Sequence, residues 1–190
     1  MDSPIRVAII IGSTREGRFG PTVARWFADQ AGQRNDDMVV DVIDLAAVDL
    51  PAAYPKTFGP GVQAYLARLD EADAFVVVTP EYNHSFPAAL KQAIDLGKRE
   101  WQAKPVAFVS YGGMSGGLRA VEQLRQVFAE LHAVTVRDTV SFHNFRRQFD
   151  ESGQPIDVAG TGAAAKTMLD QLAWWAVTLR TARAERPYAA

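Results

Sequence analysis

Continuous runs of apolar, mostly β-branched residues alternate along this chain with segments whose apolar residues recur every three or four positions. Such runs are typical of strands in a parallel sheet, because helices in the crossover connections cover both of its faces. The expected strands are Ile5–Ile11, Met38–Ile43, Ala74–Thr79, Val106–Ser110 and Ala133–Val136. The expected helices are Pro21–Gln33, Gly61–Asp70, Phe86–Arg99, Leu118–Leu131 and Ala163–Ala184. The alternation predicts a doubly wound α/β fold with a five-stranded parallel sheet.

Composition limits the classes of protein to which the chain can belong. Its 190 residues, 48% of them hydrophobic, suffice for one domain spanning residues 1–190. The formal net charge is −2 and the basic residues are dispersed, so we expect neither a nucleic acid nor a membrane as partner. Cysteine is absent, which excludes thiolate chemistry, so any redox reaction requires a bound cofactor. No signal peptide pattern and no apolar stretch of ~20 residues is found, and we expect a cytoplasmic protein.

The first loop, Gly12–Pro21, joins the first expected strand to the first expected helix. A helix N-terminus binds anions, because unpaired backbone N–H groups and the positive end of the helix dipole meet there. Pro21 suits the first helical position and Gly20 the capping position before it. We therefore expect a phosphate group at this loop.

Side chains of the first loop strengthen this expectation. Ser13 provides a hydroxyl donor and Arg15 a planar guanidinium that matches phosphate oxygens, and Arg18 lies within reach of the same group. The alternative is that both arginines are solvated charges on a glycine-rich turn. The glycines, at positions 12, 17 and 20, match neither the P-loop nor the dinucleotide fingerprint. This argues against ATP or GTP hydrolysis and against a tightly bound NAD.

Two further loops follow neighbouring strands: the second loop, Thr79–Ser85, after the third strand, and the third loop, Ser110–Gly117, after the fourth. In doubly wound sheets, ligands bind beyond the carboxyl ends of the strands where the strand order reverses, as FMN does between the first and third strands of flavodoxin. The four glycines of the third loop allow backbone to approach a flat ring closely. They also allow a flexible turn, with Ser115 or Gly117 capping the next helix.

Other chemistries find little support in the sequence. The three histidines, His84, His132 and His143, form no i, i+4 pair, so no metal site is expected. Ser115 lies in Gly-Gly-Met-Ser-Gly-Gly, which is not a nucleophile elbow, so hydrolysis is a weak candidate.

The region Arg137–Gly160 is a long, aromatic-rich segment without clear periodicity, typical of a functional or disordered loop. His143 within it could contact a substrate, although a histidine among aromatic residues is more often a packed or interface residue. The last helix carries an apolar face typical of core packing, with Trp174 to one side; the face consists of Leu169, Leu172, Trp175, Ala176 and Leu179.

Four motifs resemble those of the NADPH-dependent FMN reductase family, a flavodoxin-like group that includes quinone, chromate and azo-dye reductases. They are Gly12-Ser13-Thr14-Arg15, Thr79-Pro80-Glu81-Tyr82-Asn83, Pro87-Ala88-Ala89-Leu90-Lys91-Gln92-Ala93-Ile94-Asp95, and Lys104-Pro105-Val106 with the glycine loop after it. The resemblance extends from about Ile5 to Leu131, and Pro-Glu-Tyr-Asn in this position is fairly specific. It implies a flavodoxin-like sandwich with strand order 2-1-3-4-5 and a bound FMN.

By position, the resemblance also assigns residues to the cofactor. Ser13, Arg15 and the backbone near Phe19 and Gly20 would hold the phosphate. Pro80, Glu81, Tyr82 and Asn83 would line the isoalloxazine, which Tyr111, Gly112, Gly113 and Ser115 would approach from the third loop. Many relatives have serine or asparagine where this chain has Arg18-Phe19-Gly20-Pro21, so the role of Arg18 stays open. Relatives commonly form dimers or tetramers, which implies a homodimer or homotetramer.

The leading hypothesis is an FMN-dependent oxidoreductase that takes two electrons from NADPH or NADH and passes them to a small acceptor: a quinone, free flavin, an azo compound or a metal oxyanion. No catalytic side chain is required, because the flavin itself accepts and donates the hydride. Two alternatives remain: a flavodoxin-like electron carrier, although such carriers tend to be strongly acidic, and a non-catalytic FMN-binding regulatory module.

Overall fold

A parallel sheet forms the centre of the molecule in the computed structural model, which describes residues 3–34 and 37–189. The strand order is β2-β1-β3-β4-β5, and a further strand, β6, also pairs with β4. The strands are β1 (Ile5–Ile11), β2 (Met38–Asp44), β3 (Ala74–Pro80), β4 (Pro105–Tyr111), β5 (Val134–Thr135) and β6 (Val140–Phe142). The predicted flavodoxin-like topology is confirmed.

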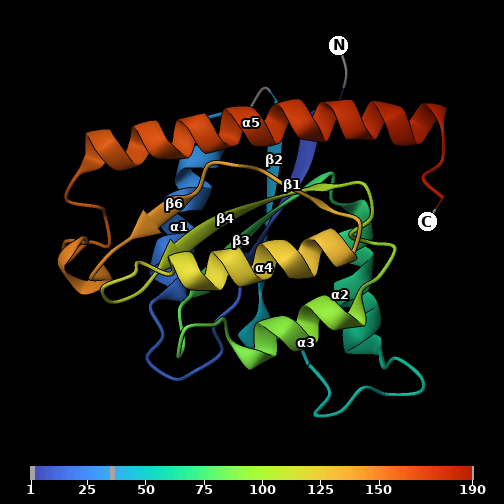
Figure 1. Ribbon diagram of the computed structural model, residues 1–190, viewed down its shortest axis with the longest axis horizontal. Coiled ribbons are helices and arrows are strands. Elements are labelled where there is room, and N and C mark those ends of the chain that lie inside the picture. Colours follow the sequence, from blue (N-terminus) through green and yellow to red (C-terminus); the bar gives the residue numbers. More distant parts are fainter. Residues whose placement is uncertain (1–2, 35–36, 190) are drawn as a thin grey trace.

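Helices cover both faces of this sheet (Figure 1). On one face lie α1 (Gly20–Gly32) and α5 (Val158–Glu185), and on the other α2 (Pro60–Glu71), α3 (Ala88–Leu96) and α4 (Leu118–Glu130). Two short 3₁₀ helices, η1 (Leu45–Ala47) and η2 (Phe145–Arg147), follow β2 and β6. No helix within the described ranges is long and apolar enough to cross a membrane.

The helices on both faces of the sheet explain the continuous apolar runs in the sequence. In β1, Val7 and Ile9 point into the core shared with α1 and α5, whereas Ala8 and Ile10 point into the core shared with α2 and α3. Every residue of β3 and of β4 is buried. Each buried methylene group contributes about 0.8 kcal/mol, so these central strands hold the two layers together.

The fifth position of the sheet differs from the prediction. Instead of one strand at Ala133–Val136, the structure has β5 beside the start of β4 and β6 beside its end. The chain leaves the ladder after Val136, whose N–H still bonds to the Val106 carbonyl, and returns at Val140. The region expected to be a loop therefore contributes a strand, because Val140 and Phe142 bury their side chains in the core.

Helix ends also differ in places. The third helix is shorter than Phe86–Arg99, because Pro87 precedes its first residue and Gly97 ends it in an extended conformation. The last helix begins at Val158 rather than Ala163, since the Asp157 carboxylate accepts a hydrogen bond from the Gly160 N–H and caps it. The cap of α1 was expected at Gly20. In the structure it is Phe19, one residue earlier, so Gly20 is the first helical residue.

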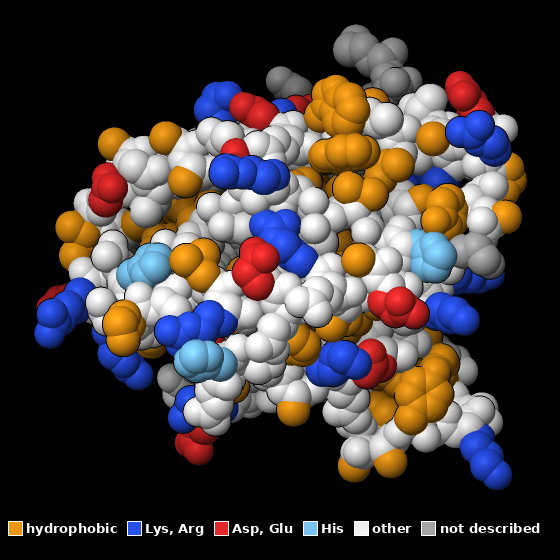
Figure 2. Space-filling view, viewed as in Figure 1, with side chains coloured by type: hydrophobic (Ala, Val, Ile, Leu, Met, Phe, Trp, Pro, Cys, Tyr) orange, Lys and Arg blue, Asp and Glu red, His pale blue; other side chains and the backbone are white. Residues whose placement is uncertain are grey.

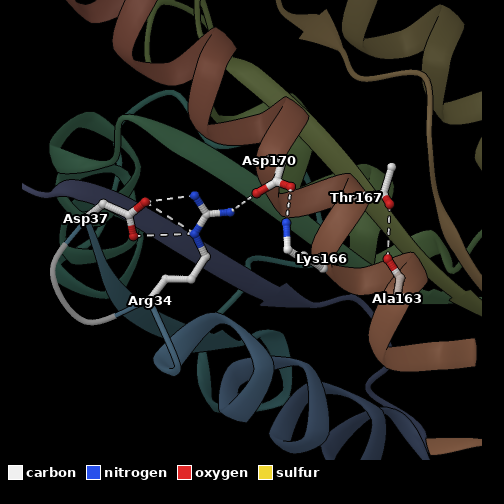
Figure 3. Close-up of polar contacts among 6 residues, drawn as sticks. All are labelled: Arg34, Asp37, Ala163, Lys166, Thr167 and Asp170. Carbon is white, nitrogen blue, oxygen red and sulfur yellow. Dashed lines mark hydrogen bonds and ion pairs between the residues drawn. The ribbon is translucent and has the colours of Figure 1, made fainter. Parts of the chain in front are cut away.

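Polar contacts join α5 to Arg34, which lies just beyond the C-terminal end of α1 (Figure 3). The guanidinium group of Arg34 donates to Asp37 at 2.7 Å and to Asp170 of α5 at 2.5 Å, and Lys166 pairs with Asp170 at 2.7 Å. Asp37 and Asp170 are about half exposed, and ion pairs at the surface contribute at most about 1 kcal/mol each. These ion pairs therefore position α5 relative to the end of α1 but add little to the stability of the fold.

Lys104 lies buried just before β4 and caps the C-terminal end of α2. Its Nζ donates to the carbonyl oxygens of Leu69 at 2.9 Å and Asp70 at 2.8 Å. Burial, reinforced by the nearby Arg183, lowers the pKa of Lys104 from 10.5 to about 8. A neutral amine still has two N–H groups for the two carbonyls, so both hydrogen bonds survive loss of the proton.

This buried lysine predicts a pH dependence of stability. Between about pH 8 and pH 10.5 the unfolded chain holds the lysine proton that the folded chain has lost, so the free energy of unfolding rises with pH, by about 1–3 kcal/mol from this group. We expect Lys104→Met to remove this increment and Lys98→Met, at an exposed lysine, to retain it. Urea unfolding at about pH 7 and pH 10 measures the difference. An equal rise in both variants would contradict the prediction.

Candidate active site

The first and second loops meet at the carboxyl ends of β1 and β3 and line one open cleft of about 330 Å³. Its walls also include Tyr111 at the end of β4 and Phe145 and Arg146 of η2. The Arg15 guanidinium lies over the ring of Tyr82, 5.2 Å from its centroid. The structure thus brings an arginine from the predicted phosphate loop against an aromatic ring from the predicted flavin loop.

Ser13 lies fully buried at the base of the first loop. The Tyr111 hydroxyl donates to its Oγ at 3.2 Å, and burial raises the pKa of Tyr111 to about 12, which keeps the phenol protonated as a donor. A Cβ atom at Gly20 would lie 2.5 Å from the Ser13 Oγ and 3.0 Å from the Tyr111 hydroxyl. Glycine is therefore required at position 20, where α1 begins against both side chains.

Free donors point to an anion at the first loop. In the described part of the chain, the backbone N–H groups of Gly17, Phe19 and Gly20 have no hydrogen-bond partner, and Arg15 forms no ion pair. They surround the start of α1, where the helix dipole adds positive potential. This donor set suits a phosphate group.

Arg18 has a different role from the other donors of this loop. Its two terminal nitrogens donate to the two oxygens of Asp44, at 2.7 and 2.6 Å, and one of them also donates to the Ser13 carbonyl at 3.0 Å. Burial opposes the charge on Asp44, but Arg18 and the Ala46 N–H outweigh it and hold the pKa of that carboxyl below its ordinary value. The pair fastens the first loop to the end of β2.

The second loop contains a tight turn from Tyr82 to Ser85, whose backbone N–H and carbonyl groups bond to each other at 2.8 and 3.0 Å. Asn83 and His84 at its centre both have positive φ, 50° and 66°, the pattern of a type I′ turn. The Gln123 side chain on α4 donates to the His84 carbonyl and accepts from the Ser85 hydroxyl. Ser85 thus belongs to this turn, and the residue that precedes α3 is Pro87.

Glu81 connects the second loop to α4. Its carboxylate accepts from the Arg119 guanidinium at 3.0 Å and from the Arg119 N–H at 3.2 Å. Burial acts to raise the pKa of Glu81, but hydrogen bonds from Ser115 and Arg119 more than offset it, and the pKa lies below its ordinary value. Glu81 is thus a stable carboxylate at the edge of the cleft.

The third loop is held by two serine hydroxyls. Ser110 and Ser141 both donate to the Gly116 carbonyl, each at 2.9 Å. Gly117 has a φ of 89° and caps α4, as the sequence allowed. Gly112 and Gly113 present bare backbone to a hollow beside the cleft and do not line the cleft itself.

The wall after β6 was missed by sequence reasoning. The N–H groups of Asn144 and Phe145 bond to the carbonyls of Gly113 and Gly112, and the Phe145 ring packs against Phe19 at 4.9 Å and Tyr111 at 5.3 Å between centroids. The only available signal was the aromatic composition of this segment. His143 is exposed rather than packed, and its Nδ1 bonds to the Met114 carbonyl at 2.8 Å.

Comparison with known proteins identifies the class of this site. The sequence profile of the family described as NADPH-dependent FMN reductase matches residues 5–147. The chain belongs to this family. It is accordingly an oxidoreductase that uses FMN with NADPH or NADH as reductant.

Members and structural neighbours of the family show how far the likeness extends. A probable NADPH:quinone oxidoreductase 2 from Oryza sativa subsp. japonica is 34% identical over 164 residues, which cover 80% of each chain. The quinone reductase of Escherichia coli K12 is 32% identical over 142 residues, 72% of this chain and 76% of that protein. FerB, a flavoenzyme NAD(P)H:(acceptor) oxidoreductase from Paracoccus denitrificans, superposes with a TM-score of 0.75 over 92% of this chain and 98% of its own, at 22% identity. This last likeness is one of fold.

The Arg18–Asp44 pair leads to a prediction about cofactor affinity. If Arg18 positions the first loop through Asp44, Arg18→Ala and Asp44→Ala should each weaken FMN binding roughly fivefold, about 1 kcal/mol, and the double variant should be no weaker than either single variant. Titration of apoprotein with FMN, followed by flavin fluorescence, measures these affinities. A gain in affinity for Asp44→Ala would mean instead that Asp44 holds Arg18 back from the phosphate.

Proposed function

We propose that this protein reduces quinones and comparable small acceptors with electrons from NADPH or NADH, through FMN held in the cleft between the three loops. The observation that carries the proposal is the junction of a donor-rich first loop with the aromatic second loop at adjacent strand ends. The names of the rice and Escherichia coli relatives support a quinone as the acceptor. When bound, FMN supplies a ring that accepts a hydride and releases two electrons.

The phosphate end of FMN would lie in the first loop. Its oxygens would accept hydrogen bonds from Ser13, Arg15 and the N–H groups of Phe19 and Gly20. Arg18 would not touch the phosphate but would hold the first loop in place through its ion pair with Asp44. Arg15 supports this assignment because its exposed guanidinium lies over the Tyr82 ring and forms no ion pair within the described chain, so it can bind an anion.

The ring end would lie between the second and third loops. Pro80, Glu81, Tyr82 and Asn83 would border it on one side, and Tyr111, Gly112, Gly113 and Ser115 on the other. Of these residues, Pro80, Glu81, Tyr82 and Tyr111 line the cleft. The role of Asn83 would be to shape the second loop, since it is one of two consecutive residues with positive φ at the centre of the turn. The lowered pKa of Glu81 and the raised pKa of Tyr111 make both poor proton donors near neutral pH, which agrees with a reaction carried by the flavin.

We also propose a homodimer or homotetramer in the cytoplasm, where reduced nicotinamide nucleotides are supplied. Phe142 and Phe149 of the aromatic-rich segment are buried within the subunit and are not available for subunit contacts. An apolar patch over the middle of α5 supports association better (Figure 2), because Trp174 is 61% and Val177 41% exposed. Static light scattering at micromolar concentration measures the assembled mass.

The phosphate assignment predicts a selective loss of FMN affinity. A charge-assisted hydrogen bond contributes ~1.5–3 kcal/mol, so Arg15→Ala should weaken FMN binding roughly 10- to 150-fold. Riboflavin, which lacks the phosphate, should bind both proteins with similar and weak affinity. An Arg15→Ala protein that binds FMN as tightly as the unmodified protein would remove Arg15 from the site.

The reaction itself predicts ping-pong kinetics. If one open face of the ring receives nicotinamide and acceptor in turn, the first product must leave before the second substrate enters. In anaerobic stopped-flow, NADPH or NADH should bleach the oxidised flavin band within seconds, and menadione should restore it. Reduction by a protein reductase but by neither nucleotide would favour the electron-carrier alternative.

A further inference from the structure

A second hollow, of about 420 Å³, adjoins the cleft on the side of the third loop. Gly112 and Gly113 form one wall, and Asn144, Phe145, Arg146 and Arg147 form the other. Phe145 and Arg146 line both the hollow and the cleft. A ligand stacked in the cleft can therefore extend into the hollow without leaving the protein surface.

The charge of this hollow is entirely positive. Arg146 and Arg147 are exposed, and within residues 3–34 and 37–189 neither forms an ion pair and no acidic side chain lines the hollow. Most other arginines around the site are engaged, Arg18 with Asp44 and Arg119 with Glu81. Figure 2 shows Lys and Arg side chains along the left margin of the molecule, where Figure 1 draws the segment after β6.

The backbone holds these two arginines in place. Asn144 enters the left-handed region at a φ of 48° and starts η2, whose position is fixed by two hydrogen bonds to the carbonyls of Gly112 and Gly113. The Phe145 ring is packed against Phe19, and the Arg146 guanidinium lies 5.2 Å from the centroid of that same ring. The guanidinium groups thus project from a short, anchored segment rather than from a free loop.

Two guanidinium groups that line one hollow match a phosphate monoester, which carries up to two negative charges near neutral pH and accepts paired N–H donors. The phosphate of FMN has its own donors in the first loop. Arg147 lines only the hollow, not the cleft that the first loop borders. A second phosphate monoester is present on NADPH, at the adenosine 2′ position, and absent from NADH.

We propose that Arg146 and Arg147 bind the 2′-phosphate of NADPH and so make the enzyme prefer NADPH over NADH. The inference rests on the proposed function, because it places the nicotinamide of the same nucleotide over the flavin in the cleft. The hollow also offers no carboxylate within the described chain for the free 2′-hydroxyl of NADH, the group that an acidic residue binds in NAD-specific Rossmann folds.

The test compares both nucleotides in a double variant, Arg146→Ala with Arg147→Ala, in the FMN-loaded protein. We expect kcat/KM for NADPH to fall at least tenfold, through KM, while kcat/KM for NADH stays within about twofold. Lysine at both positions should restore part of the preference, because it keeps the charge but not the paired donors. Arg186→Ala, at the far end of α5, is the matched control and should change neither value.

A binding measurement separates this site from the reaction. Calorimetry should show that NADP⁺ binds the oxidised, FMN-loaded protein at least tenfold more tightly than NAD⁺, and that the double variant loses this difference. A loss of FMN affinity with no change in riboflavin affinity would assign the arginines to the FMN phosphate and overturn the inference. Equal use of NADPH and NADH by the unmodified protein would also overturn it. If neither nucleotide reduces the flavin, the proposed function is refuted, whereas tighter binding of NADP⁺ that the double variant loses would still support the arginine site.

Discussion

The burial of β1, β3 and β4 under helices on both faces is the constraint from which the site follows. Parallel strands covered in this way send every connection to a helix from the same edge of the sheet. Loops after neighbouring strands must therefore meet at the carboxyl edge, where the strand order reverses between β1 and β3. The packed core is thus the physical reason that a donor-rich loop and an aromatic loop share one cleft.

Close packing continues into the loops themselves. Gly20 allows α1 to begin against Ser13 and Tyr111, and the hydrogen bond between those two side chains joins the ends of β1 and β4. The turn at Asn83 is fixed from α4 by Gln123. Because each loop is held by side chains from other elements, the cleft exists before a ligand enters it, which reduces the entropy lost on binding.

Ion pairing then decides which arginines remain for ligands. Arg18 pairs with Asp44 and Arg119 pairs with Glu81, so these two arginines hold loops in place. Arg15, Arg146 and Arg147 form no ion pairs in the described part of the chain, and all three surround the cleft or its continuation. Two separate positive regions result, one at the start of α1 and one on η2.

The sequence by itself determined the central strands, most of the helices and the three loops that meet at the site, and the strand order followed from its resemblance to a known family. Hydrophobic periodicity and the glycine and proline positions are local signals, and in this chain they agreed with the fold. Only the tertiary structure decided that Arg18 pairs with a carboxylate 26 residues away, that Tyr111 reaches Ser13 across 98 residues, and that the segment from β6 to η2 closes the site. Those contacts join residues far apart in the chain, and their geometry depends on the packing of whole elements, which no local pattern records.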